Sequence, residues 1–160
     1  MSEQVETSQA VRRTVTVAAS QQRAFQVFTE QFGSWWPKEY HLGSAEMADF
    51  VVESKAGGRW YEVGVDGTEC DWGRVLEWGA PGRLVLAWML DGDWRFDPDA
   101  ERASRVEVTF TEVGPDQTVL RLVHTGFEAR GEGGGSVHRG VGSADGWQAY
   151  LDALVAFTTA

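Results

Sequence analysis

The sequence predicts an α+β fold in which a curved antiparallel sheet of six or seven strands lies against a long C-terminal helix. Three observations predict it. A β-branched segment is followed by a helical pattern near the N-terminus, a period of two dominates from residue 49 to residue 124, and helical spacing returns from residue 143. Grouped strands with helices before and after them are typical of α+β folds, in which helices cover one face of an antiparallel sheet.

The N-terminal part predicts one strand and one short helix. Residues 11–17 (VRRTVTV) are rich in β-branched side chains that alternate, which is the pattern of a strand. Ser20 then offers an N-cap, and apolar residues recur at helical spacing until Gly33. These signals predict a helix over residues 21–31, with a broken extra turn through Trp36.

Two adjacent tryptophans and a proline, Trp35, Trp36 and Pro37, close this segment. Adjacent side chains on a helix point about 100° apart, so a single buried surface cannot take both indoles. Pro37 also disfavours the α region for Trp36 and so turns the chain. We therefore expect Trp35 to anchor the segment in the core and Trp36 to face a cavity or its mouth.

Six further strands are predicted from the period of two. Asp66-Gly67 stands between two of them and is a strong signal for a tight hairpin. The order of strands and turn residues indicates an antiparallel meander. The predicted strands cover residues 49–54, 58–65, 68–78, 83–90, 104–113 and 117–124.

The last predicted element is a helix over residues 143–159 with one apolar stripe. An apolar stripe must be buried against another element, so we expect this helix to lie across the concave face of the sheet. The stripe consists of Trp147, Tyr150, Leu151, Leu154 and Phe157.

Length and composition predict one domain over residues 11–160, preceded by a disordered polar tail over residues 1–10. Cys70 is the only cysteine, and the N-terminus lacks the pattern of a signal peptide, so we expect a reducing, cytoplasmic location. The net charge of -10 argues against nucleic acid and anionic lipid as partners. No apolar run approaches the length of a membrane span, so no membrane partner is predicted.

Five blocks of the sequence are familiar in combination. They resemble the SRPBCC superfamily (START, polyketide-cyclase and birch-pollen-allergen-like proteins) and, within it, the group named for the activator of the heat-shock chaperone ATPase. The resemblance implies a helix-grip fold, with an often apolar hollow between the sheet and the C-terminal helix. The blocks contain no family-wide catalytic motif, so no catalytic residue is assigned. They are FTEQFGSWWPKEYH at 28–41, GGRWYEVGVDGTECDWGRVLEW at 57–78, PGRLVLAW at 81–88, LRLVHTGFE at 120–128 and GWQAYLDAL at 146–154.

Aromatic side chains are more abundant than a core of this size requires, with eight tryptophans among 160 residues. Because ligand sites are typically lined by apolar and aromatic side chains, an aromatic cavity is one interpretation. The alternative is that these rings simply fill the space between sheet and helix. The candidates are Trp36, Trp60, Trp72, Trp88, Trp94 and Trp147.

Strand alternation also selects polar candidates for ligand contact. Glu62 shares a strand face with Trp60, Arg74 shares one with Trp72, and His124 ends an apolar face. If these faces point inward, the three groups converge on the concave side, and a buried Glu62 would need Arg74 as its partner. The opposite register leaves Glu62 and Arg74 as a solvated pair that contributes under about 1 kcal/mol.

Two further candidates have both a structural and a ligand-binding interpretation. His124 is either a structural residue of the core or a ligand contact. Tyr150 lies one turn from Trp147 on the apolar stripe, so its hydroxyl could hydrogen-bond a ligand or only a backbone carbonyl.

The sequence predicts no metal site and no cofactor. His41, His124 and His138 are far apart in the sequence, and no Cys/His pair has ligand spacing. The glycine-rich run at residues 131–136 lacks the ending of a phosphate-binding loop.

Two loops remain as candidates for a role at the site or at a surface. Residues 126–142 are expected to form a mobile loop that gates a cavity, with His138 and Arg139 near the entrance. The acidic loop over residues 91–103 carries Trp94 and Phe96, an aromatic pair that could serve a protein partner.

Three functions therefore stay open. The first is a binding domain for a small hydrophobic or aromatic ligand. The second, suggested by the group's name, is an interaction module for a chaperone. The third is a cyclase- or hydrolase-type enzyme, with Glu62 or His124 as acid or base and Tyr150 orienting the substrate.

Overall fold

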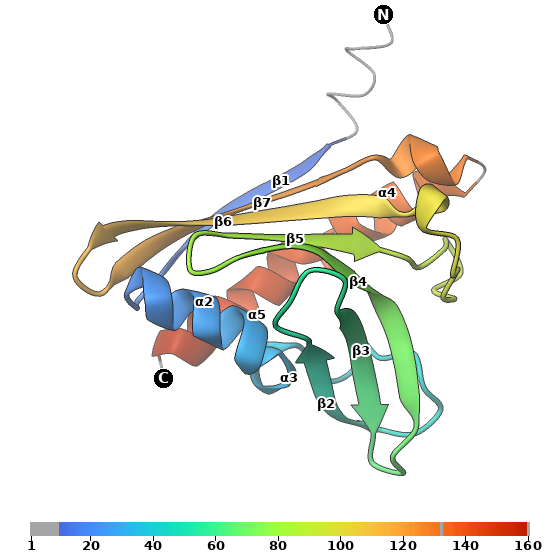
Figure 1. Cartoon of the computed structure of the whole chain (residues 1–160), viewed down its shortest axis with the longest axis horizontal. Helices are drawn as coiled ribbons and strands as arrows, with labels where there is room; N and C mark the ends of the chain where they lie inside the picture. Colours follow the sequence, from blue (N-terminus) through green and yellow to red (C-terminus); the bar gives the residue numbers. More distant parts are fainter. Residues whose placement is uncertain (1–9, 132, 160) are drawn as a thin grey trace, which may run out of the picture.

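The computed structural model describes residues 10–131 and 133–159, which form one curled antiparallel sheet with helices on its concave side (Figure 1). The expected disordered tail lies outside these residues, apart from residue 10. The strands are β1 (Val11–Val17), β2 (Met47–Val52), β3 (Arg59–Gly64), β4 (Glu69–Gly79), β5 (Arg83–Trp88), β6 (Ser104–Gly114) and β7 (Gln117–Thr125). The helices are α2 (Gln21–Glu30), α3 (Phe32–Trp35), α4 (Gly134–Gly142) and α5 (Trp147–Thr159), with short 3-10 helices η1 (Ala100–Arg102) and η2 (Phe127–Arg130).

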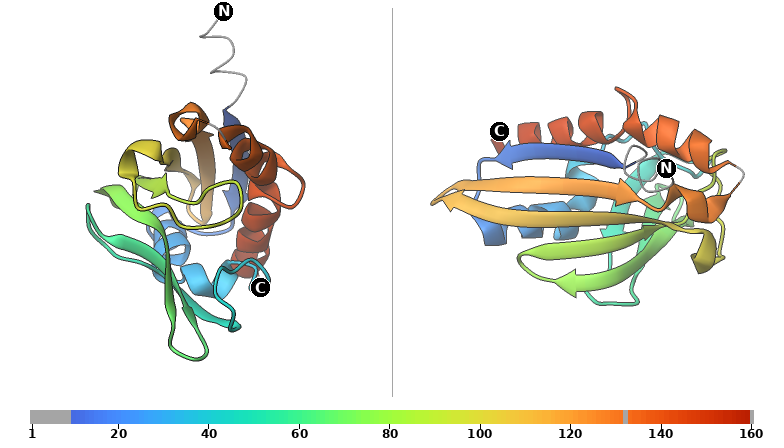
Figure 2. Two further views of the ribbon diagram at one scale, coloured as in Figure 1. Left: turned by 90° about the vertical axis from the view of Figure 1, so that its right-hand side faces the viewer. Right: turned by 90° about the horizontal axis from the view of Figure 1, so that it is seen from above.

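The sheet has seven strands in the order β1-β7-β6-β5-β4-β3-β2. Strands β2 to β7 follow one another as an antiparallel meander, and β1 pairs with β7, so that Val11 lies opposite His124. Figure 2 shows the sheet curling around α2 and α5. The predicted α+β fold, with a curved sheet that grips the C-terminal helix, is confirmed.

Helix α5 begins four residues later than predicted, at Trp147 instead of Ser143. A turn precedes it, in which the Gly146 N–H donates to the carbonyl of Ser143 over 3.0 Å. A Cβ atom at Gly146 would lie 2.1 Å from the carbonyl oxygen of Val141, so only glycine permits this close approach of the chain after α4. The inward face of α5 matches the predicted stripe and buries Trp147, Tyr150, Leu151 and Leu154.

The two adjacent tryptophans diverge as expected, but both are buried. Trp36 has extended backbone angles (φ -64°, ψ 131°), which agrees with the restriction imposed by Pro37. Trp35 packs on Phe28 and is 3% exposed, whereas Trp36 reaches across to Tyr150 and is 2% exposed. Trp36 therefore sits inside the packed interior and not at the mouth of a cavity.

The expected mobile loop over residues 126–142 is instead folded into η2 and α4. Glycines make α4 a weak helix former by itself, because each loses much backbone freedom on ordering. Val137 and Val141, one turn apart, are both buried, so packing of this pair against the rest of the protein offsets the low propensity. The prediction of a mobile segment was wrong because it considered local propensity alone.

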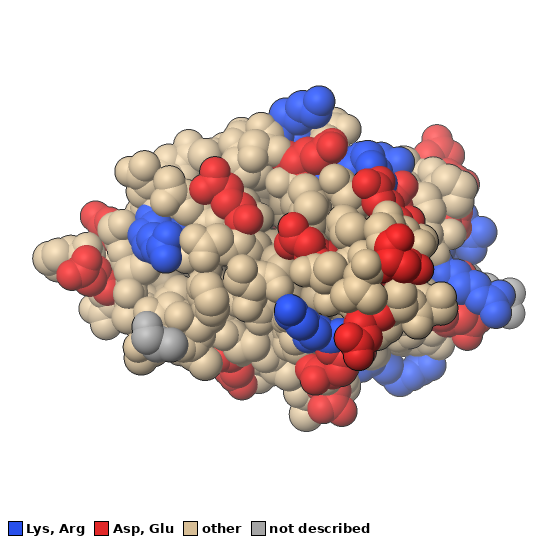
Figure 3. All heavy atoms as spheres, turned by 90° about the horizontal axis from the view of Figure 1, so that it is seen from below, with Lys and Arg blue, Asp and Glu red and all other residues tan. Residues whose placement is uncertain are grey.

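Charged side chains of both signs mix on the face shown in Figure 3. Ion pairs also form elsewhere in the described structure, for example between Arg83 and Glu77 at 2.6 Å, and the net charge of the whole sequence stays at -10. None of the helices in the described ranges is both long and apolar enough to cross a membrane.

Candidate functional site

Six of the predicted ligand-lining residues meet in one interior cluster between the sheet and α5, which we call the aromatic interior. Neighbouring ring centroids lie close together, from 4.3 Å for Trp36 and Tyr150 to 6.2 Å for Trp36 and Trp147. Phe32 and Phe50 complete the cluster. The rings occupy space that the sequence interpretation assigned to a cavity. The six are Trp36, Trp60, Trp72, Trp88, Trp147 and Tyr150, each at most 2% exposed.

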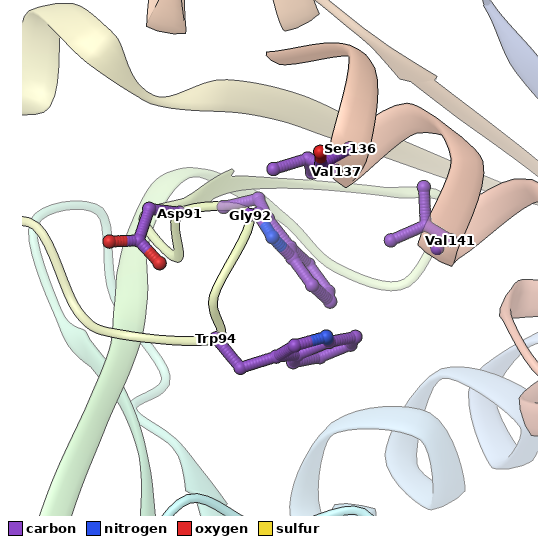
Figure 4. Close-up of a pocket in the computed structure, with 8 residues that line it drawn as sticks. Asp91, Gly92, Trp94, Ser136, Val137 and Val141 are labelled. Carbon is purple, nitrogen blue, oxygen red and sulfur yellow. The ribbon is translucent and has the colours of Figure 1, made fainter. Parts of the chain in front are cut away.

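A small cavity lies at one end of the aromatic interior, between the loop after β5 and α4 (Figure 4). Its volume is about 10 Å³, enough for about one water molecule. Trp88 and Trp94 line it from one side, and Ser136 and Val141 line it from α4. A larger open groove of about 330 Å³ lies elsewhere, between α2 and Pro81, and contains none of the predicted site residues.

Glu62 on β3 points into the interior, as one of the two predicted registers required. Its carboxylate is 1% exposed and accepts hydrogen bonds from the backbone N–H groups of Leu42 (2.5 Å) and Gly43 (3.1 Å). It also accepts one from the Trp72 indole over 2.9 Å. Three donors therefore satisfy the buried carboxylate without a cation. The two backbone donors also connect the loop after Trp36 to the sheet.

Arg74 does not join Glu62, so the predicted ion pair is wrong. One irregularity in β4 causes this: Trp60 pairs with Gly73 whereas Tyr61 pairs with Asp71, so β4 contains one extra residue at this point. An extra residue reverses the alternation of side chains, so strict period-two counting fails along this strand. Arg74 is 37% exposed and contacts Asp71 at 3.6 Å on the outer side of the sheet.

His124 is fully buried and acts as a connector between three elements. Its Nδ1 lies 3.0 Å from the Trp147 indole nitrogen, and its Nε2 lies 2.7 Å from the Ser104 hydroxyl. An indole N–H can only donate, so Nδ1 is the acceptor and the proton resides on Nε2. Burial, helped by His138, lowers the pKa of His124 to about 3, so the ring is neutral at ordinary pH.

Tyr150 contributes its ring to the aromatic interior. It contacts Trp36 at 4.3 Å and is covered by Tyr40 at 5.1 Å. Burial raises the pKa of Tyr150, so the hydroxyl stays protonated. The hydroxyl is not among the fully buried polar atoms that lack a partner in the described part of the chain.

Two buried indole N–H groups in the aromatic interior, those of Trp60 and Trp88, have no acceptor among the described residues. The indoles of Trp36, Trp72 and Trp147 are all paired, with the Tyr40 carbonyl, Glu62 and His124 respectively. An unpaired buried donor costs about 1–3 kcal/mol, so these two groups are the polar atoms that the interior leaves unused.

The sequence places Trp94 both among the candidates for an aromatic cavity and in a loop that could serve a protein partner. Its ring lies against the aromatic interior, 5.9 Å from Trp72 and 5.8 Å from Trp88, while 40% of the residue is exposed. The signal in the sequence was its position in a short loop directly after the aromatic end of β5. Phe50 was missed, although the alternation of β2 places it inward.

No metal site is built from the part of the chain that the structure describes, since it contains no group of three or more His, Cys, Asp and Glu residues able to hold an ion. The aromatic interior presents ring faces, two indole donors without an acceptor among the described residues, and one tyrosine hydroxyl.

The fold and the order of its elements agree with one known family. A family profile described as "Activator of Hsp90 ATPase homolog 1-like protein" matches residues 18–158. The chain belongs to this family. Its members share the helix-grip architecture of the SRPBCC superfamily, so the resemblance seen in the sequence is confirmed. A comparison with curated proteins gives no match.

Solved structures similar to this member of the Hsp90-activator-like family include two above 30% identity. One is an anthrahydroquino-γ-pyrone synthase, Txn09, complexed with SUM; it is 38% identical, with a TM-score of 0.66, and the match covers 92% of this chain and 95% of the other. The second is the self-sacrificing resistance protein CalC from Micromonospora echinospora, 33% identical, with a TM-score of 0.70 and 93% of both chains covered. Protein NE0264 from Nitrosomonas europaea, 16% identical with a TM-score of 0.64 and 94% of both chains covered, shares the fold.

Proposed function

We propose that this protein binds a flat, fused-ring aromatic small molecule that carries carbonyl oxygens, in the aromatic interior beneath α5, where rings must move aside to admit it because the cavity there measures about 10 Å³. The observation that carries the proposal is the pair of buried indole N–H groups on Trp60 and Trp88 that have no acceptor among the described residues. They stand among closely packed ring faces and edges, 5.8 Å apart by centroid. A ligand with an aromatic plane would pack against these rings, and its oxygen atoms would accept hydrogen bonds from the two indole N–H groups.

The two unpaired indole donors cost the free protein stability. Each unpaired donor costs about 1–3 kcal/mol, and a ligand oxygen that accepts from it recovers part of that cost. Stacked or edge-to-face contacts add about 0.5–1.5 kcal/mol per aromatic pair. A purely aliphatic ligand would provide neither contribution, so we expect selectivity for oxygenated aromatic compounds.

The name of one of the two relatives above 30% identity supports this ligand class. One is named as a synthase of an anthrahydroquino-γ-pyrone, a fused aromatic ring system bearing oxygen atoms, and was solved as a complex. The other is named as a self-sacrificing resistance protein, a name that states no ligand. Both match nearly the full length of this chain, so the fold that encloses the interior is shared.

The polar groups favour binding over acid–base catalysis. Glu62 already accepts three hydrogen bonds from the protein. His124 uses both ring nitrogens within the core, and its lowered pKa of about 3 makes it a poor base near neutrality. His124 has no free ring nitrogen, and Glu62 has three of its roughly four acceptor positions occupied, so binding is the simpler function of this interior.

The proposal is tested by titrating the protein with 1,4-dihydroxyanthraquinone, a flat three-ring compound with two carbonyl groups. Tryptophan fluorescence should be quenched with saturation, and the melting temperature should rise, because a ligand present at 100 times its Kd adds about 2.7 kcal/mol to stability. Decane-1,10-diol, an oxygenated aliphatic compound, should produce neither effect.

Matched variants locate the site. Trp88→Phe keeps a ring but removes the unpaired N–H, and we expect about 5- to 10-fold weaker binding, the value of one neutral hydrogen bond. Trp78→Phe is the control, because Trp78 packs on Phe25 beside the separate groove at α2. An absence of saturable binding, or equal losses in the two variants, would reject the proposed site.

A further inference from the structure

We propose that Trp94 is an internal plug, whose indole occupies the outer end of the aromatic interior and is displaced by the ring system of the ligand. This inference rests on the proposed function and adds to it the route of access and the residue that must move. It follows from four features of the loop between β5 and η1: the packing of Trp94, its backbone, the space around it and the donor behind it.

The packing of Trp94 is intermediate between core and surface. Its ring meets the rings of Trp72 and Trp88 edge to face, at interplanar angles of 71° and 72°. These two partners are each at most 1% exposed, whereas Trp94 is 40% exposed. Trp94 is thus the one member of the tryptophan cluster that can leave it without crossing other side chains, because solvent lies on its other side.

The backbone of Trp94 is held in an unfavourable conformation. Its φ is 61°, and it is the only residue other than glycine with a positive φ in the described part of the chain. A bulky side chain in the left-handed region is strained, so movement of this residue to an ordinary conformation releases free energy. That release offsets part of the contact energy that Trp94 loses when its ring leaves Trp88.

The loop that carries Trp94 is short and has its own fastening. The Asp91 carboxylate accepts the N–H groups of Asp93 (2.8 Å) and Arg95 (3.0 Å), and Leu90 pairs with Phe96 across the base. The Trp94 N–H also donates to the Asp91 carbonyl over 3.1 Å. All of these bonds are local to the loop, so an outward swing of Trp94 breaks bonds within the loop only and leaves the strands of the sheet paired.

The space around Trp94 adjoins Trp88, the residue whose indole N–H has no acceptor among the described residues. The 10 Å³ cavity is bounded by Trp94 and Trp88 on one side and by α4 on the other, as Figure 4 shows for the loop residues and for Ser136, Val137 and Val141. A Cβ atom placed on Gly140 would already be in contact with Trp94, at 3.9 Å from Cζ2. Removal of the indole would join this cavity to the solvent and leave a slot about one ring thick beside Trp88.

The shape of that slot specifies the ligand chemistry more narrowly. A flat ring system replaces the indole against the edges of Trp72 and Trp88, and a carbonyl at its inner end accepts the Trp88 N–H that has no partner in the described structure. Trp94 supplies the ring contacts in the free protein but cannot satisfy that donor, because an indole has no acceptor. The ligand therefore has an advantage that the plug lacks.

The test compares wild type with Trp94→Ala in stopped-flow binding of 1,4-dihydroxyanthraquinone. Apparent affinity scales with the fraction of molecules in the open state, so removal of a plug should strengthen binding by about fivefold or more and speed association. Arg95→Ala is the matched control in the same loop, because Arg95 does not line the cavity. Its affinity and association rate should equal those of wild type.

A second measurement follows the plug directly. In protein labelled with 5-fluorotryptophan, the ¹⁹F resonance of Trp94, assigned by its absence in Trp94→Phe, should move to the position of a solvent-exposed indole when the anthraquinone binds. A resonance that stays in place while the probe saturates the protein overturns the plug.

The outcomes separate the two proposals. If the probe binds wild type but binds Trp94→Ala equally or more weakly, Trp94 is a fixed wall or a bystander; the plug is then rejected and the proposed function stands. If the probe binds Trp94→Ala and not wild type, both proposals gain support. If neither protein shows saturable binding, the proposed function is rejected together with the plug.

Discussion

At the scale of a single residue, His124 shows how burial decides the role of a titratable group. A histidine in a strand is compatible with a base, a ligand contact or a structural link. Its two hydrogen bonds, to Trp147 and Ser104, and its pKa of about 3 make it a neutral connector in the folded protein. Burial keeps His124 neutral, which makes it unsuited to acid–base chemistry. For the same reason the stability of the folded protein depends on pH through this group.

Stability should fall as the pH drops below about 6.5, because the unfolded chain binds a proton at His124 and the folded chain does not. With a folded pKa of about 3, the loss from this group continues down to about pH 3 and amounts to about 2 kcal/mol between pH 7 and pH 5. Urea unfolding at the two pH values measures it.

His124→Gln is the control for this prediction, since it removes the titrating group and should flatten the dependence between pH 7 and pH 5. NMR provides a second measurement on the wild-type protein, where the His124 ring should not titrate above pH 5. Equal losses of stability in the two proteins would refute the assignment.

At the scale of an element, β4 shows how local irregularity redirects function-bearing side chains. The shift between its pairing with Trp60 and Tyr61 places Trp72 and Gly73 in the interior and turns Arg74 outward. Gly73 makes this possible, because its backbone approaches the neighbouring strand β5 too closely for any side chain. Because Arg74 points outward, Glu62 accepts hydrogen bonds from other donors, among them the Leu42 N–H of the loop.

Gly73→Ala should therefore be severely destabilising. A Cβ atom there would lie 1.8 Å from the carbonyl oxygen of Ala87, which is backbone and cannot move aside. We expect a loss of about 3 kcal/mol or more in the free energy of unfolding. Gly82→Ala is the matched control, since its nearest neighbour would be at an ordinary 3.6 Å. Comparable melting temperatures for the two variants would contradict the close approach.

At the scale of the whole molecule, the aromatic interior joins the layers of the fold. Rings from α3, β3, β4, β5 and α5 contact one another, and the Trp147 indole adds a hydrogen bond from α5 to His124 on β7. The C-terminal helix is thereby attached to the sheet by packing and by one buried polar contact. An interior of this kind combines stability with the unpaired donors proposed for ligand recognition.

Trp147→Phe and Trp88→Phe should differ in stability, although both replace an indole with a smaller ring. Trp147→Phe leaves His124 without its donor, whereas Trp88→Phe removes a donor that has no acceptor among the described residues. The first should cost about 1–3 kcal/mol more than the second. Urea denaturation of both variants without ligand measures the difference, and equal costs would contradict this assignment of hydrogen bonds.

The sequence alone determined the elements and their order. Alternation identified β1 at residues 11–17, Asp66-Gly67 marked the hairpin, and the stripe from Trp147 to Leu154 fixed the inward face of α5. Each of these signals is local, because a few neighbouring side chains reveal which face is apolar. Six of the aromatic residues that the sequence suggested for ligand contact share one buried environment, and their role in binding stays a prediction.

Only the tertiary structure decided what those residues do together. Counting alternate residues along β4 does not reveal the extra residue that turns Arg74 outward. Helix propensity does not reveal the packing that stabilises the glycine-rich α4. The pairing of His124 with Trp147, the unpaired N–H of Trp88 and the position of Trp94 all depend on contacts between segments far apart in the chain. Hydrogen-bond partners and free volume are properties of the packed molecule, so local sequence patterns do not contain them.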